Sequence, residues 1–97
     1  MSVLVKNLGN GIKNVTINDP KTYNSLSLAT LASLLKTFKK LDKDNNTKVI
    51  ILNGSGKGFS AGHNLKEVRS LKVRSKYLKL FNLCSKVMIQ IVEGRKP

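Results

Sequence analysis

A short apolar run that opens into a glycine-rich loop limits most strongly what this chain can fold into. The run is Val49-Ile50-Ile51-Leu52, and the loop that follows Asn53 is Gly54-Ser55-Gly56-Lys57-Gly58-Phe59-Ser60-Ala61-Gly62. A run of this kind bounded by glycines predicts a buried strand that ends in a loop. Glycines there let main-chain N–H groups approach a ligand, and such donors can hold an anion or a developing oxyanion. The segment therefore predicts a site built from backbone.

The N-terminal part of the chain predicts a β-hairpin. Val3 to Lys6 forms the first expected strand, and Asn10-Gly11 is a strong hairpin turn signal. Apolar residues at positions 12, 15 and 17 mark a second strand, with an irregularity expected at Asn14. Pro20 ends this strand, and residues 21–25 are expected to form a loop.

Two helices and one more strand complete an α/β chain with the order β-β-α-β-α. Ser27 is a good N-cap for a helix that runs to about Asp42, because leucines and Phe38 recur at helical spacing. The third strand covers 48–52, and a long helix is expected over about 70–93, with Gly94 at its C-terminal stop. The apolar stripe of this second helix is formed by Val73, Tyr77, Leu80, Phe81, Cys84, Val87, Met88 and Ile91.

The segment Phe59-Ser60-Ala61-Gly62-His63-Asn64-Leu65 resembles the signature of the crotonase (enoyl-CoA hydratase/isomerase) superfamily, Phe-Ser/Cys-Ala-Gly-x-Asp-Leu. A second match is Ile17-Asn18-Asp19-Pro20-Lys21-Thr22-Tyr23-Asn24-Ser25-Leu26-Ser27, and Lys96-Pro97 resembles the residues before the next core strand. The sequence from Gly62 to Glu67 is most similar to the enoyl-CoA hydratase domain-containing branch. The resemblance extends over essentially the whole chain. It implies a spiral of ββα turns with parallel strand pairing.

The resemblance also implies a substrate and a site. Members of this superfamily bind a coenzyme A thioester and stabilise the enolate with two backbone N–H groups, without a tightly bound cofactor. By motif match, the backbone N–H of His63 is the first oxyanion donor, and Gly62 permits the close approach. Residues expected to contact acyl-CoA are Ser60, Ala61, Gly62, His63, Asn64, Leu65, Asn24 and Leu26. Asn64 stands where the family has Asp, so an amide replaces a carboxylate there.

Residues 1–97 are expected to form the N-terminal part of a crotonase-like domain and to lack its second half. In the family that half carries the second oxyanion donor and the glutamates used in acid–base chemistry. We therefore expect the chain to be inactive by itself. We also expect it to expose apolar surface, which a second copy or a complementary C-terminal half would cover.

The strong positive charge leaves three interpretations open. Eighteen Lys and Arg against five Asp and Glu give a net charge of +13. This charge is consistent with a solvated surface, with attraction to the phosphates of coenzyme A, or with nucleic-acid binding. The lysines are spread along the chain and no nucleic-acid-binding signature is visible, so nucleic acid is the least favoured. A non-catalytic basic module that binds protein or nucleic acid is the alternative function.

Other site hypotheses are weaker. The His63 side chain has no nominated nucleophile or carboxylate beside it, and Glu67 and Glu93 lie far apart in the sequence. Cys84 lies in an apolar stripe, so it is expected in the core, and no metal-ligand cluster is visible. The spacing Gly56-x-Gly58-x-x-Ala61 matches a dinucleotide fingerprint but follows the wrong strand.

The predicted cellular location depends on the single cysteine and on the lack of a long apolar segment. The single cysteine cannot form an internal disulfide, which favours a reducing compartment such as the cytosol. No segment approaches the roughly 18–20 apolar residues of a membrane span.

Overall fold

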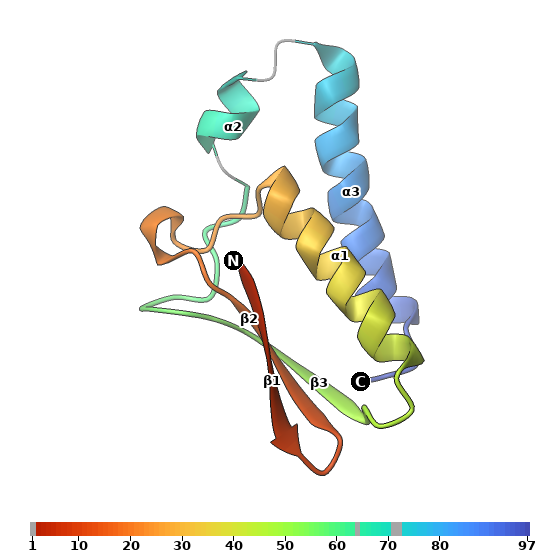
Figure 1. Cartoon of the computed structure of the whole chain (residues 1–97). Helices are drawn as coiled ribbons and strands as arrows, with labels where there is room; N and C mark the ends of the chain where they lie inside the picture. The colour runs from red at the N-terminus through yellow and green to blue at the C-terminus, as the bar shows by residue number, and fades with distance from the viewer. Residues whose placement is uncertain (1, 64, 71–72) are drawn as a thin grey trace.

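The computed structural model describes residues 2–63, 65–70 and 73–97, and it has the α/β order expected from the sequence (Figure 1). Its elements are β1 (Val3–Gly9), β2 (Ile12–Ile17), the 3-10 helix η1 (Pro20–Thr22), α1 (Leu28–Lys43), β3 (Val49–Gly54), α2 (Leu65–Ser70) and α3 (Arg74–Glu93). The turn η1 lies inside the segment that was expected to be loop. Its only backbone hydrogen bonds are local, which explains why periodicity does not reveal it.

The sheet has the strand order β1-β2-β3. β1 and β2 form the predicted antiparallel hairpin, and Asn10 and Gly11 both have positive φ (55° and 80°), as a two-residue hairpin turn requires. β1 continues to Gly9, beyond the predicted end at Lys6. The register shift lies between Asn7 and Gly9, so the irregularity predicted at Asn14 was wrong. Asn14 pairs regularly with both neighbouring strands.

β3 pairs in parallel with β2, from Ile12 opposite Val49 to Ile17 opposite Gly54. The prediction that this strand is buried was wrong, because it is an edge strand whose Val49 and Ile51 are exposed. A parallel pair needs a crossover, and α1 supplies it. The Ser27 side chain accepts a hydrogen bond from the backbone N–H of Thr30 (3.2 Å), which confirms the predicted N-cap. The helix and the sheet enclose the core, which consists of Val3, Val15, Ile17, Leu31, Leu34, Phe38, Leu41, Leu80 and Val87.

The helix predicted over about 70–93 is α3, which begins at Arg74, and a short helix that was not predicted, α2, precedes it. α2 ends at Ser70, and α3 begins at Arg74 after an extended residue, Val73 (φ −120°, ψ 133°). The Glu67 carboxylate of α2 accepts a hydrogen bond from the backbone N–H of Leu28 (2.9 Å), so a contact distant in sequence ties α2 to the start of α1. Periodicity within one segment could not reveal that contact.

α3 packs beside α1 and ends at Glu93, as predicted (Figure 1). Gly94 has extended backbone angles (φ −61°, ψ 154°), so it is not needed for a left-handed cap. It is needed for space, because a Cβ there would lie 2.6 Å from the Gln90 carbonyl oxygen.

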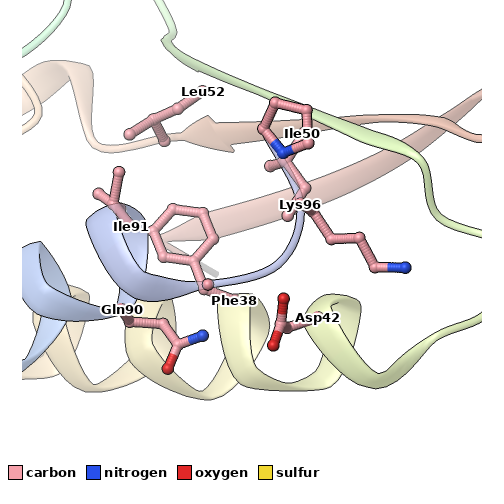
Figure 2. A pocket seen from close by; sticks show the side chains of 9 residues that line it. Phe38, Asp42, Ile50, Leu52, Gln90, Ile91 and Lys96 are labelled. Atoms are coloured by element: carbon pink, nitrogen blue, oxygen red, sulfur yellow. The ribbon is translucent and has the colours of Figure 1, made fainter.

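The last residues return to the free edge of β3. The backbone N–H of Arg95 donates to the Asp42 carboxylate (2.7 Å), and the N–H of Ile50 donates to the carbonyl of Pro97 (2.9 Å). A small, largely apolar pocket of about 100 Å³ lies there, and Figure 2 shows the Phe38 ring facing Ile91 and the strand. The carbonyl of Pro97 therefore forms a hydrogen bond with the outer edge of β3, on the side opposite β2.

Candidate functional site

The glycine-rich loop after β3 is held by one buried side chain, Asn24. Its Nδ2 donates to the carbonyl oxygens of Ser55 (2.7 Å) and Gly58 (3.1 Å), and its Oδ1 accepts the backbone N–H of Asp19 (2.8 Å). Asn24 therefore stabilises the turn after β2 and the loop after β3. Its predicted contact with a ligand stays a prediction.

The loop approaches this anchor closely because β3 ends in glycine. A Cβ at Gly54 would overlap the carbonyl oxygen of Phe59 and would lie 2.8 Å from Nδ2 of Asn24. No other residue type fits this turn without displacing the loop.

Three further hydrogen bonds join the two matched motifs. Ser60 Oγ donates to the Asn24 carbonyl (2.7 Å) and accepts the Gly62 N–H (3.1 Å). The Ala61 N–H donates to the Tyr23 carbonyl (2.8 Å), and the Leu26 N–H donates to the Gly62 carbonyl (2.7 Å). The structure thus brings together most of the predicted site residues. It makes Ser60 and Ala61 positioning residues of the loop.

The backbone N–H of His63 differs from its neighbours. The N–H groups of Ala61 and Gly62 are used within the chain, whereas the N–H of His63 donates to no residue that the structure describes. Gly62 has φ 86°, and a Cβ there would meet no atom within 4 Å. A free donor beside an open, side-chain-free surface is what an incoming oxyanion requires.

The His63 side chain is directed elsewhere. Its ring packs edge-on against Phe81 of α3, with ring centroids 5.1 Å apart and planes at 80°. This contact supports the interpretation of the imidazole as a bystander in the chemistry. It also fixes the residue that carries the free N–H, a role that no sequence pattern indicated.

The remaining residues considered for the site are Asn64, Leu65, Cys84 and Glu67. Asn64 lies outside the described residues, and Leu65 is the first residue of α2. Cys84 is half-buried against the core, as expected, and Glu67 bonds the start of α1. Within the described ranges, no group of three His, Cys, Asp or Glu could hold a metal ion.

A wider pocket of about 440 Å³ lies on one side of the loop. It is lined by Pro20, Lys21, Tyr23, Asn24, Ser55, Gly56, Lys57 and Gly58. Tyr23 has a positive φ of 55° and 73% of its side chain is exposed. Lys21, Tyr23 and Lys57 were not among the predicted site residues, because only the chain fold brings them to the same pocket.

The helices of the described part of the chain differ from membrane spans. None of its helices has both the length and the apolar character that a membrane span requires.

Comparison with known proteins places this geometry in a family. The family described as "Enoyl-CoA hydratase/isomerase" matches residues 7–96. The human enoyl-CoA hydratase domain-containing protein 3, mitochondrial, is 42% identical over 81 residues, which are 84% of this chain and 27% of that protein. The probable peroxisomal enoyl-CoA hydratase 1 of Arabidopsis thaliana is 41% identical over 69 residues, 71% of this chain and 26% of that protein.

Solved structures agree. A crystal structure of an enoyl-CoA hydratase from Mycobacterium smegmatis superposes with a TM-score of 0.95 at 38% identity, and that of the human domain-containing protein 3 with 0.92 at 37%. Each match covers all of this chain and 38% of the solved chain. The chain thus spans about a quarter to two fifths of the length of these relatives. It belongs to the crotonase (enoyl-CoA hydratase/isomerase) family, in the enoyl-CoA hydratase domain-containing branch.

Proposed function

We propose that this chain forms part of an acyl-CoA site of the crotonase type and contributes one backbone oxyanion donor, the N–H of His63. The observation that carries the proposal is that this N–H alone, among those of residues 61–63, makes no hydrogen bond to a described residue. When charge moves onto the thioester oxygen, a fixed donor stabilises it without reorganisation. Losing one such donor typically costs about 10²–10³ in rate.

Contacts of the loop hold the His63 N–H in a fixed position, as an oxyanion donor requires. Gly62 has no side chain to block the thioester, and its own N–H and C=O are both bonded, to Ser60 and Leu26. The His63 ring is packed on Phe81, which restrains the same residue from the other side. The donor is thus positioned before the ligand arrives.

The neighbouring pocket supports a polyanionic ligand. Lys21 and Lys57 line it, together with the backbone of Gly56 and Gly58 and the exposed ring of Tyr23. Two ammonium groups attract phosphate oxygens, and an exposed aromatic face can stack on a purine. We propose that the phosphate and base portions of coenzyme A lie on this side of the loop, with no tightly bound cofactor.

Acyl-CoA and a further copy or complementary half of the domain are the proposed partners. The net charge of +13 leaves a basic module that binds nucleic acid as the alternative function. A cytosolic location stays a prediction, since the names of the relatives above give mitochondria and peroxisomes.

Calorimetric titration with coenzyme A separates the two functions. We expect weak binding that Gly62→Val abolishes, because the new side chain occupies the open surface beside the donor. Gly9→Val is the matched control: Gly9 has the same positive φ (87°) and the same free space, but it lies in the hairpin away from the loop. His63→Ala keeps the backbone donor and should retain binding.

The same titration with a single-stranded oligonucleotide tests the alternative. A basic module would bind the oligonucleotide more tightly than coenzyme A, lose affinity steeply with salt and be indifferent to Gly62→Val. That combination, or equal losses of coenzyme A binding in Gly62→Val and Gly9→Val, would refute the acyl-CoA proposal.

A further inference from the structure

Tyr23 adopts a backbone conformation that its residue type disfavours. It follows the 3-10 turn η1 with φ 55° and ψ 42°, in the left-handed region. There the Cβ of an L-residue crowds the following carbonyl oxygen, so glycine, asparagine and aspartate are the usual occupants. Asn24, the next residue, has the same φ of 55° but belongs to a type that tolerates it. A tyrosine is therefore kept at position 23 at a cost in conformational energy.

The fold does not use the Tyr23 ring to offset that cost. The side chain is 73% exposed, and within the described ranges it packs on no other aromatic ring. Disfavoured backbone conformations of this kind cluster at ligand-binding sites, where the surrounding contacts impose them. The ring therefore points to a function outside the core.

Hydrogen bonds on both sides of Tyr23 impose the conformation. Its N–H donates to the Pro20 carbonyl (3.1 Å), and its carbonyl accepts the N–H of Ala61 (2.8 Å) from the end of the glycine-rich loop. The N–H of Asn24 donates to the Asp19 carbonyl (2.8 Å). Tyr23 can leave this conformation only if the turn detaches from the loop.

Two hydroxyl groups brace the same turn. The Ser25 hydroxyl, on a residue that is 3% exposed, donates to Thr22 Oγ1 (2.9 Å), and Thr22 Oγ1 donates to the Asp19 carboxylate (2.8 Å). This chain of hydrogen bonds joins residues on either side of Tyr23 and ends on a charged acceptor. Neither Thr22 nor Ser25 lines the neighbouring pocket, so their effect on it passes through Tyr23.

The pocket of about 440 Å³ beside the loop shows what the ring can bind. Lys21 and Lys57 line it together with Tyr23. A base can stack on an aromatic face while its phosphates lie against ammonium groups. We propose that Tyr23 is the specificity residue that selects an adenine-bearing ligand at this pocket. Thr22 and Ser25 are the positioning residues that hold it there.

The inference rests on the proposed function for its ligand, which is the nucleotide end of coenzyme A. A side chain presented by a fixed backbone loses less freedom when a ligand binds. The proposal therefore links two properties: removing the Tyr23 ring should stabilise the free chain and weaken nucleotide binding. A residue kept for packing would instead lose stability and leave binding unchanged.

Calorimetric titration of the 97-residue chain with adenosine 3′,5′-bisphosphate, and with pyrophosphate as an anion without a base, tests the specificity. Tyr23→Asn should weaken nucleotide binding by roughly tenfold and leave pyrophosphate binding unchanged. Tyr23→Phe keeps the ring and should bind both as the native chain does. Thr22→Val and Ser25→Ala should weaken nucleotide binding by about two- to fivefold, again without an effect on pyrophosphate.

Thermal unfolding of the same variants tests the strain. Tyr23→Asn should raise the unfolding midpoint by about 4 °C, because asparagine tolerates the left-handed conformation. Asn10→Tyr is the reverse exchange, at the hairpin residue that also has φ 55°. It should lower the midpoint by a similar amount and leave the binding of both ligands unchanged.

Three results would overturn the proposal. They are a native chain that does not bind the nucleotide, a Tyr23→Asn chain that binds it equally well, and a Tyr23→Asn chain that unfolds at a lower temperature than the native one. Nucleotide binding that needs Tyr23, together with coenzyme A binding that is indifferent to Gly62→Val, would refute the oxyanion donor and support the role of Tyr23. The two proposals can therefore fail separately.

Discussion

Single side chains decide the shape of the candidate site, and Asn24 is the main one. Its amide bonds two carbonyls of the glycine-rich loop, which follow it by 31 and 34 positions in the sequence. It is 1% exposed and adopts a positive φ of 55°, which asparagine tolerates better than most residues. The residue thus links the turn after β2 to the loop after β3.

Replacing Asn24 by Ala should destabilise the chain measurably. The carbonyls of Ser55 and Gly58 and the N–H of Asp19 lose their part-buried hydrogen bonds, and a polar group left unsatisfied away from water costs about 1–3 kcal/mol in the free energy of unfolding. Asn53→Ala is the control, because Asn53 makes one exposed side-chain hydrogen bond, to Thr16 (2.7 Å). Urea unfolding should show a large shift for Asn24→Ala and a small one for Asn53→Ala. Similar shifts in the two variants would contradict the anchoring role.

Asp44 should make the stability depend on pH in acid. The hydrogen bond from the Thr47 hydroxyl (2.7 Å), then that from the Asn46 N–H, lowers the pKa of Asp44 below its ordinary value of 3.8. A lowered folded-state pKa adds stability above the ordinary value, and that stability is lost as the pH falls through the folded-state pKa. The gap in unfolding free energy between the native chain and Asp44→Asn should therefore be present at pH 6 and close below about pH 4. A gap that stays constant from pH 6 to pH 2 would count against this.

At the scale of elements, the end of β3 determines what the loop can do. β3 runs to Gly54, and Ser55 continues the pairing by donating its N–H to the Ile17 carbonyl (2.9 Å). The chain then folds back so that the carbonyl of Phe59 lies against Gly54. The strand, the turn and the free N–H of His63 are therefore one continuous structural unit.

Gly54→Ala should disturb this unit, whereas Gly58→Ala should not. The new Cβ at position 54 overlaps the Phe59 carbonyl, and overpacking of this kind costs about 1–3 kcal/mol. A Cβ at Gly58 meets no atom within 4 Å, and such a substitution is expected to change stability by no more than about 0.5 kcal/mol. Thermal unfolding and coenzyme A titration of both variants check this. Equal behaviour of the two would show that the close approach is unimportant.

At the scale of the whole molecule, the chain corresponds to 38% of the solved relatives on which it superposes. The one carboxylate near the start of α1, Glu67, accepts the Leu28 N–H and so has a structural contact. The N–H of His63 makes no hydrogen bond to a described residue, and within the described ranges no group of three His, Cys, Asp or Glu could hold a metal ion. Within the described residues, the edge of β3 beyond the Pro97 hydrogen bond and the exposed apolar residues of α3 are left uncovered.

These 97 residues by themselves should show no enoyl-CoA hydratase activity. Losing one oxyanion donor costs about 10²–10³ in rate, and losing general acid–base groups costs on the order of a further 10²–10⁴. The ultraviolet absorbance of a crotonyl thioester, followed at stoichiometric protein, should therefore stay constant. The enoyl-CoA hydratase of Mycobacterium smegmatis serves as the positive control. A decrease in absorbance with the chain alone would show that we have missed catalytic groups.

The sequence by itself determined the elements whose signals are local. The hairpin turn at Asn10-Gly11, the cap at Ser27, the apolar periodicity of α1 and the run that became β3 depend only on residues close in the chain. The motif from Phe59 to Leu65 predicts the backbone donor at His63, and the apolar spacing of α3 is recognisable from its own residues. Apolar periodicity and the residue preferences of turns and caps depend on residues close in the sequence, so they can be recognised from the sequence.

Only the tertiary structure decided how these parts contact one another. Glu67 bonds the start of α1, His63 packs on Phe81, and Tyr23 and Lys21 join Lys57 at one pocket. The residues joined by these contacts lie 18 to 39 positions apart in the sequence. Such pairs form only when the crossover closes the sheet, and no local pattern records which buried donor will meet which acceptor.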